Sequence, residues 1–192
     1  MDENALRAVA ALLEERNAID AEIARHIGRP MTAGHLGEWI AAQVFDIDLA
    51  AAANVRAIDG RFASGPLAGR TVNVKWYPRR EGILDLTGAV HPDYYLVLAG
   101  PAAPAVTSRG GVRPWCVESV HLFDAPRLLA DQRSRGVGTG TASSVPADRW
   151  AAAETYPRPA DPVLAVHPGQ AAVLRRFAPP QDASGIPTQR LP

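Results

Sequence analysis

The stretch Tyr94–Gly100, with the sequence YYLVLAG, constrains the fold most strongly because both of its faces are apolar. Such a strand is typical of the centre of a sheet that is covered on both sides. The stretch Arg70–Tyr77 alternates between two kinds of side chain, with Val72, Val74 and Trp76 on one face. A third strand is expected within 113–123. We therefore expect an α/β protein with a mixed β-sheet flanked by helices.

Three segments have the apolar spacing and end signals of helices. The segment 2–27 begins with capping residues and stops at the Gly-Arg-Pro of 28–30. Its apolar residues recur at near-helical spacing and are Leu6, Val9, Leu13, Ile19, Ile23 and Ile27. A second helix is expected over 32–45 and a third over 124–133, where Asp124 is the N-cap.

The length of 192 residues fits one domain, which we divide into three parts. Residues 1–30 are expected to form an N-terminal helix packed on the core, and residues 31–135 the mixed-sheet core. Residues 136–192 are rich in glycine and proline and are expected to form an irregular extension of the same domain, with a short helix within 147–157 and another short element at 170–177. Its last residues are expected to be a disordered tail.

The charge balance and the absence of long apolar runs limit the classes of function. The formal net charge is +0, so a nucleic-acid site has to be a local patch. The single Cys116 excludes a disulfide within the chain. No apolar run reaches the ~18–20 residues that span a bilayer, and the N-terminus lacks the pattern of a secretory signal. We expect a cytoplasmic protein without membrane contact.

Three charged residues occur where an apolar or neutral residue would be easier to place. Lys75 is the only lysine among 20 lysines and arginines and lies inside a strand-like run. Glu38 is the one formal charge of the 32–45 helix, and Asp59 is expected at the start of a strand. If these residues meet, they suit Mg²⁺-assisted phosphodiester hydrolysis, since Mg²⁺ uses one or two carboxylates and a nearby ammonium offsets transition-state charge. The alternative is a solvated Lys75 that pairs with Asp59 on a sheet face.

The segments AIDGRF (57–62) and VNVKWY (72–77), with a glutamate on a preceding helix, resemble the PD-(D/E)xK, or restriction-endonuclease-like, nuclease superfamily. The resemblance covers roughly residues 32–100 and implies a restriction-endonuclease-like core that binds Mg²⁺ or Mn²⁺. It makes Lys75 the catalytic lysine and Asp59 the metal aspartate. The further ligands that it implies are Glu38, Asn73 and the carbonyl of Val74.

Two departures from the family pattern are visible in the sequence. An acid is usual at the position of Asn73, which is neutral and shorter than the glutamine of some relatives. The family also commonly has a helix after the lysine strand, whereas here the strand at 94–100 comes first.

Local charge around these residues favours a polyanionic partner. The sequence from Asn54 to Glu81 contains six cationic and two anionic residues, which gives a local net charge of 6 − 2 = +4. The residues expected to contact nucleic acid are Arg56, Arg61, Arg79, Arg80 and Trp76. Surface arginines around a core tryptophan would give the same pattern.

The sequence thus predicts a Mg²⁺-dependent nuclease that acts on DNA and could form a homodimer. The competing interpretation is a catalytically inactive module of the same fold that binds nucleic acid or a protein partner. A third is a different enzyme that uses His91, Asp93 and the glycine-rich loop at 135–146.

Overall fold

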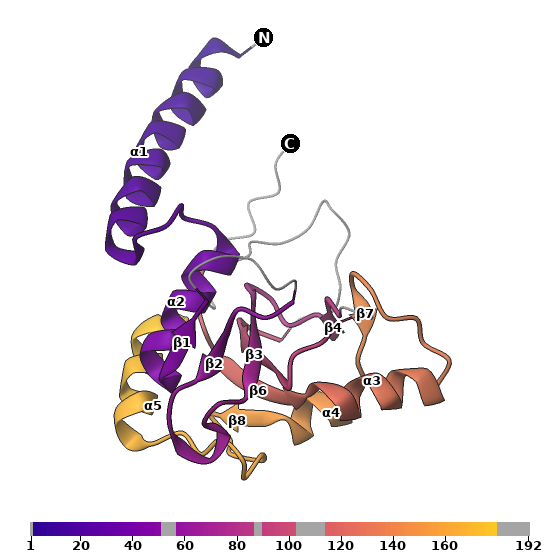
Figure 1. Cartoon of the computed structure of the whole chain (residues 1–192). Coiled ribbons are helices and arrows are strands. Elements are labelled where there is room, and N and C mark those ends of the chain that lie inside the picture. Colours follow the sequence, from indigo (N-terminus) through magenta and orange to yellow (C-terminus); the bar gives the residue numbers. More distant parts are fainter. Residues whose placement is uncertain (1, 51–56, 87–89, 103–113, 180–192) are drawn as a thin grey trace.

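The computed structural model describes residues 2–50, 57–86, 90–102 and 114–179 of the chain. Within these ranges a six-stranded mixed sheet runs in the order β1-β2-β3-β5-β6-β8 (Figure 1). Its strands are β1 (Ile47–Leu49), β2 (Gly60–Phe62), β3 (Thr71–Tyr77), β5 (Tyr94–Ala99), β6 (Ser119–Asp124) and β8 (Glu154–Tyr156). The short strands β4 (Ile83–Leu84) and β7 (Ser143–Ser144) form a separate two-stranded sheet.

One pair of strands in the main sheet is parallel, and the others are antiparallel. Strands β1, β2 and β3 form an antiparallel meander, β3 pairs with β5 in parallel, and β5, β6 and β8 are antiparallel. Strand β5 lies in the middle, where all residues from 95 to 99 are buried. The expectation of a central strand that is apolar on both faces is confirmed there.

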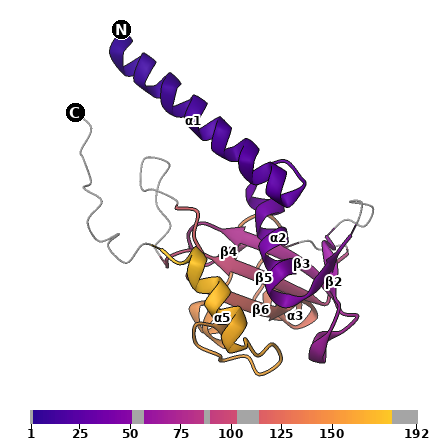
Figure 2. The same ribbon diagram turned by 90° about the vertical axis from the view of Figure 1, so that its left-hand side faces the viewer.

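Helices cover both faces of the sheet. The helices are α1 (Glu3–Ile27), α2 (Ala33–Phe45), α3 (Ala125–Ser134), α4 (Ala147–Ala152) and α5 (Pro168–Leu174), with 3₁₀ turns η1 (Gly65–Leu67) and η2 (Arg175–Phe177). Figure 2 shows α2 and α5 in front of one face, where they share a core with Val72, Val74 and Trp76. On the opposite face α3, α4 and β4 pack against Tyr95 and Val97.

The predicted helix ends agree with the structure because their capping signals are local. Asp2, Thr32 and Asp124 each accept a hydrogen bond from a backbone N–H in the first turn of α1, α2 and α3. Gly28 ends α1 in the left-handed conformation that glycine favours. The α/β class with an N-terminal helix and a mixed sheet flanked by helices is confirmed.

Two expectations about the ends of the chain are wrong. Helix α1 does not lie on the core: Ile27 is its one buried residue, and both views show the rest extending away (Figures 1 and 2). The segment after residue 135 is not an irregular extension, because 154–156 supply the sixth strand and α5 buries Leu174 fully. The short elements expected within 147–157 and at 170–177 correspond to α4 and α5, but strand β8 was not expected. The tail at 180–192 lies outside the described residues.

Candidate active site where strands β2 and β3 separate

Asp59 lies just beyond the paired part of β2. The last pair of the β2–β3 ladder joins Gly60 to Val72, and the Asp59 N–H donates to the Val72 carbonyl over 2.9 Å. On the side of β3 that faces β2, the next N–H is that of Val74. It has no strand partner and donates to Asp59 Oδ2 over 2.7 Å. A strand residue directs its carbonyl to the same side as its N–H, so the Val74 carbonyl also faces the gap beside Asp59.

Gly60 is required beside Asp59 because β1 passes very close to it. A Cβ at this position would lie 2.5 Å from the Asp48 carbonyl oxygen and 2.8 Å from an Ile47 methyl group. The Ile-Asp-Gly sequence thus has a local structural reason. Glycine allows β1 to approach, and the Ala50 N–H can then donate to the Asp59 carbonyl over 2.8 Å.

Burial raises the pKa of Asp59 to about 6, and nearby charges modify that shift. The Val74 hydrogen bond lowers the pKa, the Glu38 carboxylate raises it, and the cations Lys75 and Arg29 lower it. Three of the predicted site residues are therefore close enough to act on one another electrostatically. A carboxylate that is this desolvated gains from a cation that neutralises it.

Glu38 reaches the site because α2 packs very closely on β3. A Cβ on Gly37 would lie only 2.9 Å from the Cβ of Trp76, so the neighbouring turn of α2 sits directly on the strand. The Glu38 side chain is 16% exposed and forms an ion pair of 2.5 Å with Arg29. Sequence reasoning missed Arg29, which looked only like part of a helix-stop signal.

Asn73 and Lys75 lie on the face of β3 opposite Trp76, beside Asp59. Asn73 is buried, and its Oδ1 atom has no hydrogen-bond partner. Buried carbonyl oxygens are nearly always paired, so Asn73 Oδ1 is an acceptor that the described chain leaves unsatisfied. Lys75 is half-buried, and within the described chain it forms no ion pair, with Asp59 or any other acid.

The predicted nucleic-acid contacts divide into three groups. Arg56 lies outside the described residues. Arg61 is exposed and donates to the Gly69 carbonyl over 2.9 Å. Arg79 Nη1 and Arg80 Nε are buried N–H groups without a partner, and the Arg80 guanidinium lies 5.9 Å from the centre of the Trp150 ring.

Trp76 is not available for base stacking, which corrects its assignment as a nucleic-acid contact. It is 7% exposed, and its indole N–H donates to the Cys116 carbonyl over 3.2 Å. Its ring packs edge-on against Trp115 with centroids 5.4 Å apart. The alternation along β3 had placed Trp76 on the face opposite Lys75, and that face is the core beneath α2.

Asp93 has a structural task that accounts for its position. Its Oδ2 atom accepts from the N–H and the hydroxyl of Thr71 over 2.8 and 2.7 Å, and Arg70 pairs with Oδ1. These bonds hold the pKa of Asp93 below its ordinary value and join the starts of β3 and β5. The enzyme that would use His91 and Asp93 therefore has no support in the geometry.

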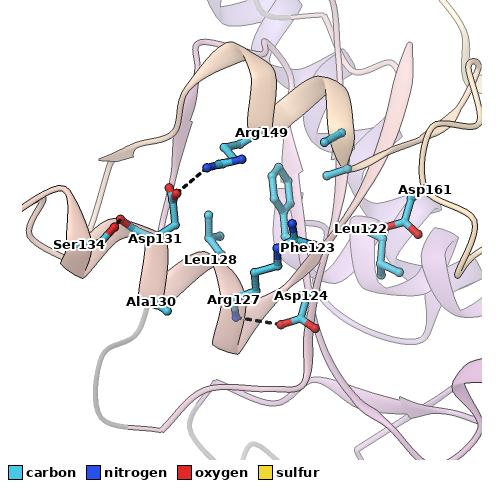
Figure 3. Close-up of a pocket in the computed structure, with 12 residues that line it drawn as sticks. Leu122, Phe123, Asp124, Arg127, Leu128, Ala130, Asp131, Ser134, Arg149 and Asp161 are labelled. Atoms are coloured by element: carbon cyan, nitrogen blue, oxygen red, sulfur yellow. Dashed lines mark hydrogen bonds and ion pairs between the residues drawn. The ribbon is translucent and has the colours of Figure 1, made fainter.

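A pocket of about 480 Å³ lies elsewhere, between β6, α3 and α4 (Figure 3), and contains none of the predicted site residues. Its acids already have partners. Asp131 accepts from Arg149 over 2.7 Å and from Arg135 over 3.0 Å, and Asp124 caps α3 through the Arg127 N–H. Asp161, the third acid of the lining, accepts from the Val163 N–H over 2.7 Å, so each acid of the pocket is already hydrogen-bonded.

Within the described residues no group of three or more His, Cys, Asp and Glu side chains is placed to share a metal ion. A cation beside Asp59 would therefore have at most two carboxylates, together with neutral oxygens.

The described residues contain no helix that is long and apolar enough to cross a membrane. Comparison of the sequence with protein-family models and with curated proteins gives no match.

Proposed function

We propose that this protein is a Mg²⁺-dependent hydrolase of nucleic-acid phosphodiester bonds, with DNA as the expected substrate and a restriction-endonuclease-like core. The observation that carries the proposal is the unpaired, buried Oδ1 of Asn73. It lies on the strand that also holds Lys75, beside the desolvated carboxyl group of Asp59.

The donor set fits a magnesium ion. Mg²⁺ in proteins is bound by oxygen atoms, usually from one or two carboxylates, and keeps several waters. Asp59 and Glu38 are the carboxylates, while Asn73 Oδ1 and the Val74 carbonyl are neutral oxygens on the same stretch of β3. When bound, the metal would acidify a water molecule and bind the phosphate.

The chain's own groups have separate tasks in this proposal. Asp59 Oδ2 accepts from the Val74 N–H, and Asp59 Oδ1 would be the oxygen that holds the cation. The Lys75 ammonium has no acid partner among the described residues, so its three N–H donors can orient the attacking water and a phosphate oxygen. The half-buried Arg79 and Arg80 would bind neighbouring phosphates through guanidinium N–H groups other than the buried Arg79 Nη1 and Arg80 Nε.

The order of the elements agrees with the family resemblance in one respect and departs from it in another. A helix with Glu38, a strand that starts after Asp59 and an antiparallel neighbour with Lys75 follow one another in the chain. The expected helix after the lysine strand is missing from the described parts of 78–93, where β4 is found.

Two observations favour the alternative, an inactive nuclease-fold module that binds nucleic acid or a protein partner. Arg29 already neutralises Glu38, and the second ligand position carries an amide instead of an acid. Such a module would bind DNA in a salt-sensitive manner without cleaving it.

Cleavage of labelled DNA with and without Mg²⁺ tests the proposal. Lys75→Ala is expected to lower the rate by about 100-fold or more, as for other lost electrostatic groups, with DNA affinity nearly unchanged. Lys75→Arg keeps the charge as a matched control and should remain slow, because a guanidinium is larger and differently shaped.

Two results would contradict the proposal, one by excluding hydrolysis and the other by excluding this site. Salt-sensitive DNA binding without Mg²⁺-stimulated cleavage would assign the inactive module. Cleavage that Lys75→Ala leaves unchanged would place the activity outside this site.

A further inference from the structure

Helix α1 leaves a long apolar surface exposed. Five of its large apolar side chains are between 51% and 62% exposed, namely Leu6, Val9, Leu12, Leu13 and Ile19. Most of the stability of a helix in a protein comes from packing of its apolar face. Large exposed apolar patches also mark interaction sites. The exposed apolar residues of α1 therefore mark a candidate interaction surface.

Five of the seven seam positions of a seven-residue repeat along α1 are apolar, and the exposed Leu12 and Ile19 lie beside this repeat. Positions separated alternately by three and four residues form the seam of a coiled coil, and in α1 they are Leu6, Val9, Leu13, Arg16, Asp20, Ile23 and Ile27. The charged residues between 7 and 25 that lie off this seam are on the outer side of the helix: Arg7, Glu14, Glu15, Glu22 and Arg25.

We propose that α1 pairs with α1 of a second copy of this chain in an antiparallel coiled coil centred on residue 18. A two-fold axis there pairs residue i with residue 36 − i. Arg16 then faces Asp20 of the other copy and Leu13 faces Ile23, while Ile27 is already buried within its own chain. Every seam residue from 13 to 23 has a complementary partner.

The two charges in the seam determine the orientation. Arg16 Nε and Asp20 Oδ2 lie 3.6 Å apart within one helix. The antiparallel pair therefore brings two arginines and two aspartates together with alternating sign. A parallel pair in register would oppose Arg16 to Arg16 and Asp20 to Asp20, and like charges in the seam exclude that arrangement.

This pairing does not depend on the proposed nuclease activity, but it would fix how two candidate sites are spaced. Arg29, which binds Glu38, follows directly after the helix cap Gly28. Residue 29 is opposite residue 7 of the other copy, so the two Arg29 residues are 29 − 7 = 22 residues apart along the axis. At the rise of an α-helix this is about 33 Å.

Molar mass in solution, measured by light scattering on the full chain, tests the pairing. The wild type is expected at twice 20.4 kDa. Arg16→Asp and Asp20→Arg should each be monomeric, because each opposes like charges, and an equimolar mixture of the two should give a heterodimer. Arg7→Asp and Glu15→Arg make the same kinds of change off the seam and should remain dimeric, with equal helicity by circular dichroism.

Cysteine cross-linking tests the orientation. A mixture of the Leu13→Cys and Ile23→Cys proteins should form a disulfide between the two variants, whereas Leu13→Cys alone should not. Cys116 is buried and stays in place. A monomeric wild type, a dimer that Arg16→Asp does not weaken, or cross-linking of Leu13→Cys with itself would each overturn the proposal.

Discussion

At the scale of single residues, Asp59 carries the most chemical information. Its carboxyl group is desolvated and fixed by one backbone N–H, and the pKa is raised to about 6. A group with a raised pKa in the folded state disfavours folding once it ionises. The free energy of unfolding therefore falls as the pH rises from about 4 to 6 and then stays level.

Asp59→Asn is expected to raise the free energy of unfolding above pH 6 without divalent ions, by on the order of 1–2 kcal/mol. The amide keeps an acceptor for the Val74 N–H and removes the desolvated charge. Chemical denaturation between pH 4 and 8 measures this gain, which should shrink toward pH 4. A gain that is independent of pH would contradict the raised pKa.

The same substitution should abolish stabilisation by the metal. The wild type is expected to show a rise in Tm with Mn²⁺ or Mg²⁺ that becomes smaller below pH 6, because protonated Asp59 cannot bind a cation. Asp59→Asn should show little rise at any pH. An equal rise in both proteins would place the cation elsewhere.

Arg29 lies outside the motif but acts electrostatically on the same site. It neutralises Glu38 at 2.5 Å and lowers the pKa of Asp59. Arg29→Ala is expected to tighten Mn²⁺ binding by roughly 3–10-fold, since one positive charge leaves the site. Calorimetric titration measures the affinity, with the exposed Arg127→Ala as a control far from the site. Weaker binding would show that Arg29 supports the site instead of competing with the cation.

At the scale of elements, α2 is held on β3 by the absence of a side chain at Gly37. Gly37→Ala would place a Cβ 2.9 Å from that of Trp76, and such overpacking costs about 1–3 kcal/mol. Gly34→Ala is the matched control because its Cβ would have no neighbour nearer than 3.8 Å. It should be neutral or stabilising by up to ~1 kcal/mol. Equal effects of the two substitutions on chemical denaturation would contradict this account.

Elements with local signals could be predicted from the sequence. The caps Asp2, Thr32 and Asp124 and the two-faced apolar strand at 94–99 each depend on a few neighbouring residues. Strands β1 and β8 have three residues each and are defined only by their partners across the sheet. Nothing within such short segments distinguishes them from turns.

The candidate site divides in the same way. Asp59, Asn73 and Lys75 stood out because a charge or an amide interrupted a strand-like pattern. Arg29 did not, because its role comes from the bend that returns the chain from α1 to α2. Trp76 was misassigned because the pattern of β3 gives the two faces but does not reveal which is covered.

At the scale of the whole molecule, stability should be uneven along the chain. Strand β5 is central and buried, whereas α1 contributes only Ile27 to the buried residues. Hydrogen exchange is therefore expected to be slowest in β5 and fastest in the first turns of α1 when the protein is dilute. Protection of α1 should rise with protein concentration if two copies pair. Protection that does not change with concentration would indicate a contact within the chain.

The outermost strands of the main sheet, β1 and β8, have only three residues each. A short edge strand offers few free N–H and C=O groups to a strand from another molecule. Intermolecular strand pairing at either edge of this sheet is therefore disfavoured. Growth into fibrils is disfavoured along that route. An assembly built through α1 alone would then close at two copies, because a two-fold contact uses the same surface on each of them.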